Sequence, residues 1–272
     1  MRDWKHQVSR EWLKARQDVL TATEARDLLA ASKKFNAVKK PSIWTAPEFL
    51  GVIAKKESLN EPDVNSPSPD AARGHILEPY AVKEFNAYAK AHGYNWPEMY
   101  PWDDCLIRDH KDSIAFSPDA MNVVQPNKDI VWHYKNNYIT SESDNIEAPT
   151  AILEIKSYNS TNHMKCGFTR KTGLKERYQL AYAMLVCPSV EDAYLMFYNP
   201  DSAQYSVFIK HYTRAELEKE MDLMYTVYQN YIWYMNELNG SQGFKYTSQY
   251  TEEQIWNEYI KEHERDVLNK EV

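Results

Sequence analysis

Two short segments carry residue types that could bind a metal ion and cleave a phosphate ester. One is the turn-like Ser117-Pro118-Asp119, and the other is the strand-like run 152–156, Ile-Leu-Glu-Ile-Lys. Because side chains alternate along a strand, Glu154 and Lys156 share one face and Ile155 lies on the other. Together with Asp119 they would form a cluster of two carboxylates and one ammonium. Hard oxygen ligands of this kind suit Mg²⁺ or Mn²⁺, which can polarise a phosphate while the lysine positions or deprotonates a water.

Each segment alone also has a simpler interpretation. Glu-x-Lys is common on strands, where it usually marks a solvated face or a cross-strand ion pair. Asp119, after Ser-Pro, is also a residue typical of turns. Neither segment by itself therefore predicts a function.

The N-terminal half of the chain is expected to be mainly helical. Residues 1–35 have helical spacing of apolar positions, with Thr21 or Thr23 as a cap between two helices. A connection follows, with a short helix at 46–56 and a Pro/Ser/Asp-rich loop at 60–71. Residues 74–92 then have the i, i+3, i+4, i+7 spacing of an amphipathic helix.

The remainder of the chain mixes strands and helices. Strands are expected near 105–107, 113–116, 151–156, 192–198 and 204–211, and an irregular polar insertion at 122–149. Helices are expected at 174–187, at 213–238, where Thr213-Arg-Ala-Glu matches a capping box, and after 243. This order predicts an α/β (α+β-like) fold with a central mixed sheet flanked by helices. We expect a domain over residues 1–212 and an acidic helical extension, packed on it or used in assembly, over 213–272.

Composition indicates a soluble globular protein, with 43% hydrophobic and 26% charged residues. No apolar run approaches the ~18 residues of a membrane span, and the N-terminus lacks the apolar region of a signal peptide, so a cytoplasmic location is expected. The three cysteines, Cys105, Cys166 and Cys187, are too far apart for a CxxC zinc site and are expected to be unpaired thiols.

The net charge of −7 by itself argues against a nucleic-acid partner. The charge is uneven, however. Residues 213–272 hold 12 acidic and 6 basic residues, which leaves the rest of the chain near neutral. A basic segment lies in mid-chain, with Lys156, Lys165, Arg170, Lys171, Lys175 and Arg177 against Glu176 alone. The distribution permits a positive groove on an acidic protein but does not demonstrate one.

Several motifs occur in a fixed order along the chain. They are Trp12-x-x-x-Arg16 with Leu20-Thr21-Ala22-Thr23-Glu24, Gly74-x-x-x-Glu78-Pro79, Ser117-Pro118-Asp119, Glu154-x-Lys156 and Tyr178-Gln179. In this order the sequence resembles the phage λ exonuclease/YqaJ family of recombination nucleases, which have the PD-(D/E)XK core. The resemblance extends from about Trp12 to about Tyr198.

The resemblance implies roles at the reactive centre. Asp119, Glu154 and the backbone carbonyl of Ile155 would hold the catalytic Mg²⁺ or Mn²⁺. Glu78 would add a carboxylate directly or through water, and Lys156 would serve the attacking water. Without the resemblance, Glu78 is equally an ordinary charge near a helix start.

Further residues would bind DNA. Gln179 would orient the water or the lysine, while Arg16, Thr23 and Ser117 would form a pocket for a 5′-phosphate, for which a guanidinium fork is suited. Phosphate contacts could also come from the basic segment, through Lys165, Arg170 and Lys171. The simpler alternatives are a solvated Gln179, an exposed Arg16, an N-cap at Thr23, where the family more often has Ser, and a solvated basic loop.

The sequence departs from the family pattern in two places. Ala120 stands where the family usually has Gly, so a positive φ there would cost about 1 kcal/mol. The insertion at 122–149 separates Asp119 from Glu154 by more than a compact hairpin needs. It could reach DNA, a partner or another subunit.

The resemblance implies a 5′→3′ exonuclease on linear double-stranded DNA that leaves 3′ overhangs for a single-strand annealing protein in phage-type recombination. It further implies a homo-oligomeric ring, such as a trimer, in the cytoplasm of a bacterial host. Two alternatives are an endonuclease, restriction-like or structure-specific, on the same core and a catalytically silent DNA-binding protein. An iron–sulfur nuclease would need a cysteine cluster, which three scattered cysteines do not supply.

Overall fold

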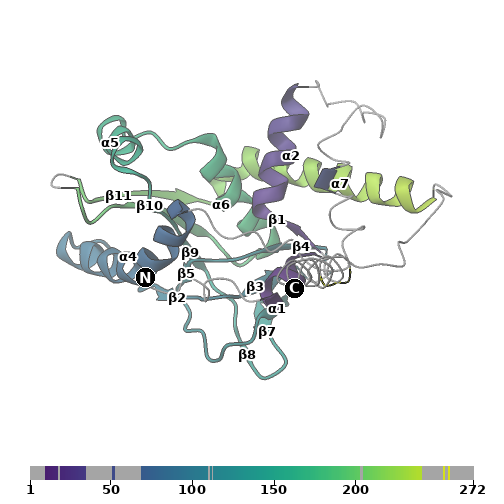
Figure 1. Cartoon of the computed structure of the whole chain (residues 1–272). Coiled ribbons are helices and arrows are strands. Elements are labelled where there is room, and N and C mark those ends of the chain that lie inside the picture. Colours follow the sequence, from purple (N-terminus) through teal and green to yellow (C-terminus); the bar gives the residue numbers. More distant parts are fainter. Residues whose placement is uncertain are drawn as a thin grey trace, which may run out of the picture. The chain divides into compact units, whose positions relative to one another are not determined.

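The computed structural model in Figure 1 describes residues 10–17, 19–34, 51–52, 69–109, 111, 113–202, 205–240, 254 and 257. By their internal contacts, residues 1–235 form one compact unit and residues 236–272 another. The boundary expected at 212/213 stays a prediction. The short helix and loop expected at 46–56 and 60–71 lie largely outside the described residues, as does the tail after 243. No helix in the described ranges is both long and apolar enough to span a membrane.

The strands form two mixed sheets, where a single one was expected. The five-stranded sheet has the order β11 (Val207–Thr213), β10 (Asp192–Tyr198), β9 (Ala151–Lys156), β5 (Ala120–Met121) and β2 (Tyr100–Pro101). In it β9 and β10 are parallel, and the other neighbours are antiparallel. The six-stranded sheet has the order β1 (Leu20–Thr21), β4 (Ile114–Phe116), β3 (Leu106–Arg108), β6 (Val131–Lys135), β7 (Tyr138–Thr140) and β8 (Asn145–Glu147). The predicted α/β class is confirmed, and the strands expected near 105–107 and 113–116 are β3 and β4, which pair antiparallel.

The helices cover these sheets (Figure 1). They are α1 (Arg10–Gln17), α2 (Ala22–Lys34), α4 (Pro69–Ala91), α5 (Ser160–Thr169), α6 (Leu174–Val186) and α7 (Glu218–Gly240), with a short 3₁₀ turn at Ala215–Leu217 before α7. Helix α4 buries Val82 and Phe85 against Leu153, Ile155 and Met196 of the five-stranded sheet. This packing fixes the Ile155 face of β9 against α4, so Glu154 and Lys156 project from the opposite face.

Two helix starts are capped by threonine–glutamate pairs. The backbone N–H and Oγ1 of Thr21 both donate to Glu24 Oε2, at 2.9 and 2.8 Å. Thr21 rather than Thr23 is therefore the cap of α2. Before α7, the backbone N–H of Thr213 donates to Glu216 Oε2 at 2.9 Å, and the N–H of Glu216 returns to Thr213 Oγ1 at 3.3 Å. The capping box expected from the sequence at Thr213 is confirmed.

The insertion at 122–149 was expected to be irregular, and this expectation is wrong. It contains β6, β7 and β8, which extend the six-stranded sheet from β3. Asn136 and Asn137 join β6 to β7 with φ of 53° and 64°, the double positive φ of a type I′ hairpin turn. Along β6, the buried Trp132 and Tyr134 alternate with more exposed neighbours. The turn and this alternation favour the antiparallel pairing of β6 with β7, although the segment is rich in polar residues.

Helix α5, within the basic segment, was also not expected. Its cap is Asn159, whose Oδ1 accepts the backbone N–H of Asn162 at 3.0 Å, and it ends at Arg170 in the left-handed region with φ of 49°. The start of the basic segment is therefore a capped helix rather than a loop. The residues that continue to α6 at Leu174 remain irregular.

Candidate active site

The segment Ser117-Pro118-Asp119 is where the chain crosses from one sheet to the other. It leaves β4 in the six-stranded sheet and enters β5 in the five-stranded sheet, where Ala120 pairs with Leu153 of β9. Ser117 therefore belongs to the side of α1 and β3, and Asp119 lies beside β9. Ala120 has no positive φ in this structure, so the strain considered for it does not arise.

Asp119 is bound to the strand that carries the other predicted ligands. Its Oδ2 accepts the backbone N–H of Ile155 at 2.6 Å. Burial raises the pKa of Asp119 well above its usual range, and the charges of Glu154 and Glu78 raise it further. Glu78, Glu154 and Ile155, all more than 30 positions from Asp119 in the sequence, thus act on its carboxyl group.

Glu154 and Lys156 form an ion pair on β9, as their shared face predicts. Both are largely buried, with 16% and 21% of their side chains exposed. Burial by itself lowers the pKa of Lys156, but the charges of Glu154 and Asp119 outweigh it, and the net pKa is raised. Lys156 is therefore an ammonium at neutral pH and can donate a hydrogen bond or a proton.

Glu78 reaches this cluster from α4. His75, one helical turn earlier, lies 3.4 Å from it through Nδ1, and this hydrogen bond raises the pKa of His75. The charge of Glu78 raises the pKa of both Asp119 and Asp104. The structure thus brings Glu78 close enough to act electrostatically on Asp119.

The donor set can be tested against a divalent cation. No group of three or more His, Cys, Asp or Glu side chains in the described part of the chain is arranged to hold a metal ion. The ligand set implied by the sequence uses only two direct carboxylates, Asp119 and Glu154, with the carbonyl of Ile155. Glu78 is not shown as a third direct ligand. Asp119 and Glu154 offer carboxylate oxygens, the donor type that divalent cations such as Mg²⁺ or Mn²⁺ prefer. Burial is the main cause of the raised pKa of Asp119, and a bound cation would relieve the added repulsion from Glu154 and Glu78.

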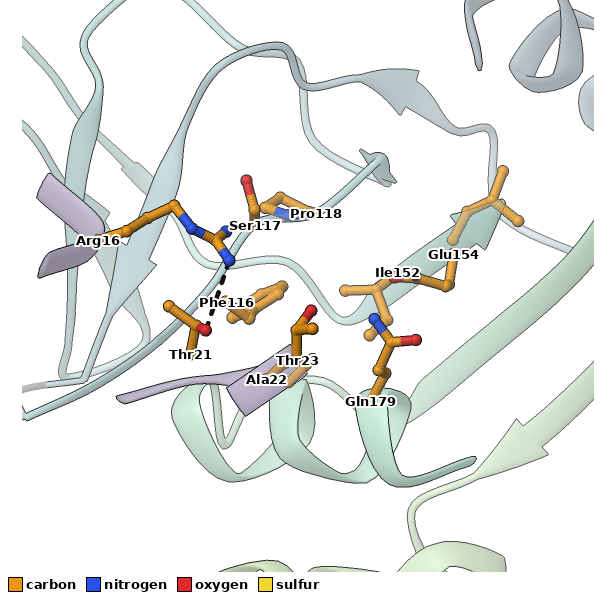
Figure 2. Close-up of a pocket in the computed structure, with 12 residues that line it drawn as sticks. Arg16, Thr21, Ala22, Thr23, Phe116, Ser117, Pro118, Ile152, Glu154 and Gln179 are labelled. Atoms are coloured by element: carbon orange, nitrogen blue, oxygen red, sulfur yellow. Dashed lines mark hydrogen bonds between the residues drawn. The ribbon is translucent and has the colours of Figure 1, made fainter. Parts of the chain in front are cut away.

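A pocket next to this cluster contains the residues predicted to bind phosphate. Arg16 from α1, Thr23 from α2 and Ser117 line it together with Glu154 and Gln179 (Figure 2). The lining is completed by Thr21, Ala22, Phe116, Pro118, Ile152, Leu153 and Ala183. Five residues spread over more than 160 positions of the sequence thus meet at one place.

Trp12 positions two members of the pocket, a role that the sequence did not reveal. Its indole ring lies under the guanidinium of Arg16, with 4.3 Å from Cζ to the ring centroid. Its Nε1–H lies 3.2 Å from the carbonyl oxygen of Cys105 and 3.3 Å from Ser117 Oγ. Ser117 itself donates a short hydrogen bond to the same carbonyl. The spacing Trp12-x-x-x-Arg16, one helical turn, was the signal that the two side chains would meet.

Arg16 lines the pocket as a charged donor. Its Nη2 lies 3.4 Å from Thr21 Oγ1 (Figure 2). Burial lowers the pKa of Arg16 from its usual value, and the charge of Glu24 opposes that shift. A guanidinium nevertheless stays protonated at neutral pH, so Arg16 brings one positive charge into a polar pocket.

Gln179 comes from α6 and is oriented by a residue that sequence analysis did not single out. Arg26 of α2 donates from Nη1 to Gln179 Oε1 at 3.4 Å, and its Nε lies 3.0 Å from Asp27 Oδ1. Because Oε1 of Gln179 accepts a hydrogen bond from Arg26, the amide NH₂ of Gln179 is the group left to donate a hydrogen bond in the pocket. No short sequence motif connects Arg26 to Gln179.

The basic segment does not enter the pocket. Lys165, Arg170 and Lys171 are exposed and are not among its lining residues. Arg177 is used elsewhere, because its Nη2 lies 2.6 Å from Glu220 Oε1 of α7. The structure thus separates a pocket with one arginine from an exposed set of cations on α5 and the residues after it.

Comparison with known proteins identifies the family. The model of the YqaJ-like viral recombinase domain matches residues 11–187. The chain belongs to this family. The matched span contains every predicted site residue, from Arg16 to Gln179, and the YqaJ resemblance expected from the sequence is confirmed.

Solved structures extend the likeness beyond the YqaJ match. An alkaline exonuclease, LHK-Exo from Laribacter hongkongensis, is similar to this chain at 18% identity with a TM-score of 0.53. The likeness covers 86% of this chain and 100% of LHK-Exo. LHK-Exo in complex with dAMP gives the same values. The YqaJ chain therefore has the fold of an alkaline exonuclease. The comparison with curated proteins gives no match.

Proposed function

We propose that this YqaJ-family protein is a metal-dependent exonuclease that degrades one strand of linear double-stranded DNA from its 5′ end. Family membership and the fold support a recombination-related nuclease. The pocket supports degradation from the 5′ end, because Arg16, Thr23 and Ser117 line the same cavity as Glu154 and Gln179. A terminal phosphate bound by Arg16, Thr23 and Ser117 would place the neighbouring phosphodiester beside Glu154 and Gln179.

The phosphate end of the pocket combines two kinds of anion attraction. Arg16 supplies a fixed guanidinium, which binds phosphate oxygens in a bidentate manner. Ala22 and Thr23 lie in the first turn of α2, after the cap Thr21, and backbone amides at a helix N-terminus favour anions. The hydroxyl of Ser117 accepts from Trp12 and donates to the carbonyl oxygen of Cys105, and it would turn its proton to the phosphate on binding. A free 5′-phosphate, with more negative charge than an internal phosphodiester, is the group that this arrangement favours.

The reactive end supplies the groups needed for hydrolysis. Asp119, Glu154 and the carbonyl of Ile155 would hold a divalent cation, with Glu78 adding a carboxylate through water. When bound, the cation would supply Lewis-acid polarisation of the scissile phosphate. Lys156, an ammonium beside Glu154, would orient the attacking water or protonate the departing oxygen. The side-chain amide of Gln179, on α6, would hold the attacking water in position.

Further features of the proposal follow from the family and the neighbouring structure. The solved complex of LHK-Exo with dAMP shows that a protein of this fold binds a deoxynucleoside monophosphate, the expected product of an exonuclease. We extend this to a product with a 3′ overhang that a single-strand annealing protein would bind. A homo-oligomeric ring around the duplex, such as a trimer, would make the degradation processive without a strongly basic surface.

One digestion assay tests metal, polarity and end dependence together. The substrate is linear duplex with a single 5′-phosphorylated end, incubated with Mg²⁺, with Mn²⁺, and with chelator. We expect loss of the phosphorylated strand from its 5′ end, no loss with chelator, and survival of a covalently closed plasmid. Arg16→Lys should reduce the preference for the phosphorylated end about tenfold, while Lys14→Gln, an exposed change on the same helix, should not.

Two outcomes would contradict the proposal. Equal cutting of the closed plasmid would show an endonuclease on the same core. No turnover of any DNA with either metal, but retained DNA binding, would show a catalytically silent binding protein.

A further inference from the structure

An exposed aromatic pair lies outside the pocket, on α5 and the β10–β11 connection. Phe168 is 65% exposed, the highest value among the large hydrophobic side chains that the structure describes, and Tyr205 is 48% exposed. Their rings meet edge to face, with centroids 5.5 Å apart and an interplanar angle of 61°. Two adjacent aromatic side chains that both remain in water leave ring surface available to a ligand.

The backbone that presents Tyr205 is strained. Its φ is 57°, in the left-handed region that bulky residues rarely occupy. His163, with none of its surface exposed, holds this conformation, because its Nε2 lies 2.6 Å from the carbonyl oxygen of Tyr205. The structure thus keeps an unfavourable backbone conformation that places an aromatic ring at the surface.

The side chain of Tyr205 packs over Gly167 of α5. A Cβ added to Gly167 would lie 3.4 Å from Tyr205 Cβ and 3.7 Å from its Cγ, so the tyrosine sits directly over this buried point of α5. One residue further along the helix, Phe168 points outward beside it. The pair is therefore built by buried contacts of His163 and Gly167, although the rings themselves are exposed.

Three basic residues lie near Phe168 in the sequence. Lys165 is one turn earlier on α5, and Arg170 and Lys171 follow the helix; all three are exposed. The structure shows no ion pair for any of the three among the described residues. Aromatic rings interleaved with unneutralised cations are the composition of surfaces that bind single-stranded nucleic acid, where bases stack on rings and phosphates meet cations.

The pair lies at the same end of the sheet as the reactive residues. Lys156, the last residue of β9, pairs with Phe197 near the end of β10, and the connection that holds Tyr205 follows β10 directly. Helix α5 begins at Ser160, shortly after Lys156, and packs on β10 and β11 (Figure 1). A strand released next to Lys156 would therefore emerge toward α5.

We propose that Phe168 and Tyr205, with Lys165, Arg170 and Lys171, form a binding site for single-stranded DNA that receives the 3′-ended strand left by degradation. Bases stack on the two rings and the backbone phosphates contact the cations. The choice of single-stranded DNA rests on the proposed function, since only strand-specific degradation supplies such a strand at this end of the sheet. Duplex DNA offers no free base faces to the pair.

Binding is measured apart from catalysis, in chelator, by fluorescence anisotropy of a labelled oligothymidylate and of a hairpin duplex. Phe168→Ala should weaken oligothymidylate binding about tenfold, Phe168→Trp should retain it, and neither should change duplex binding. Tyr225→Ala on α7, where the tyrosine is 50% exposed, is the matched control and should change nothing.

Tyr205→Gly separates a binding role from a structural one. Glycine accepts the positive φ at no steric cost, so the thermal midpoint should stay at or above that of the wild type. Binding of oligothymidylate should nevertheless fall about tenfold, because the ring is gone. A loss of stability together with unchanged binding would show that the tyrosine is structural and would overturn the proposal.

The remaining outcomes are distinguishable. If Phe168→Ala and Tyr205→Gly bind oligothymidylate as the wild type does, the site is wrong even when the wild type degrades linear duplex. If they change the mass in light scattering without changing this affinity, the pair is instead an interface between copies. If binding falls as expected but the wild type degrades no DNA, the site stands and the proposed exonuclease function fails.

Discussion

The carboxylate of Asp119 accepts the backbone N–H of Ile155, the residue between Glu154 and Lys156, at 2.6 Å. This contact joins two residues that lie 36 positions apart in the sequence, and the chain between them includes a three-stranded extension of the neighbouring sheet. It ties the carboxyl group to the catalytic strand before any metal is present. The same position places Asp119 in the field of Glu154 and Glu78, and this arrangement has consequences for both stability and activity.

Asp119→Asn should stabilise the metal-free protein and abolish its proposed activity. Burial and two neighbouring carboxylates disfavour the ionised form of Asp119, so a neutral amide of the same shape removes a cost to folding. We expect the thermal midpoint in chelator to rise by a few degrees, and DNA degradation to fall more than about a hundredfold. Glu147→Gln, on exposed β8, is the control and should alter neither quantity. A destabilised Asn variant would mean that the carboxylate is held by favourable contacts instead.

The pH dependence of stability follows from the same carboxyl group. Its pKa in the folded protein is raised above the unfolded value, so the folded state keeps a proton that the unfolded chain has released. The stability it contributes is present below the unfolded pKa and is lost as the pH rises through the folded pKa. In chelator, the difference in unfolding free energy between Asp119→Asn and wild type should therefore grow with rising pH over that window. Urea unfolding at several pH values measures it, and a difference that does not change with pH would contradict the assignment.

Trp12→Phe should impair recognition of the DNA end without unfolding the protein. Phenylalanine keeps a ring under Arg16 but has no N–H to donate toward Cys105 and Ser117. We expect KM for 5′-phosphorylated duplex to rise several-fold while kcat changes little, since no reacting group is removed. The KM for duplex with a 5′-hydroxyl end should be much less affected. Equal increases of KM for both substrates would show that Trp12 supports the fold in general and does not act through the phosphate pocket.

Thr213→Ala should cost about 1 kcal/mol of folding free energy, because it removes one half of the capping box before α7. Thr213→Ser retains the hydroxyl and should cost much less. Both variants should degrade DNA as the wild type does, since the capping box is no part of the pocket. Chemical denaturation measures the first effect, and an equal loss in both variants would show that the hydroxyl contributes nothing.

Sequence patterns were sufficient where one period or one motif dominated. The apolar run 151–156 is β9 to the residue, and its alternation placed Glu154 and Lys156 on one face. Thr21, one of the two caps expected before α2, caps that helix, and the Thr213–Glu216 pair is a capping box in the structure. These features depend on neighbours within a few residues, so the local sequence contains them.

Other features depend on contacts that no local pattern contains. Polar composition concealed β6 to β8, although Asn136-Asn137 between alternating side chains was a usable turn signal. The chain passes from one sheet to the other at Ser117-Pro118-Asp119. The hydrogen bond from Arg26 to Gln179 joins residues of two helices that lie 153 positions apart in the sequence. The roles carried over from family motifs could place Arg16, Thr23 and Ser117 in one pocket, but not Trp12 as the residue that contacts both Arg16 and Ser117.

Binding of Mn²⁺ without DNA, followed by electron paramagnetic resonance at neutral pH, measures whether Asp119 and Glu154 hold a divalent cation. We expect saturable binding by the wild type and by Glu147→Gln, weakened more than about tenfold in Asp119→Asn and in Glu154→Gln. Binding of Mn²⁺ that is equally tight in all four proteins would contradict this expectation, as would the absence of binding to the wild type.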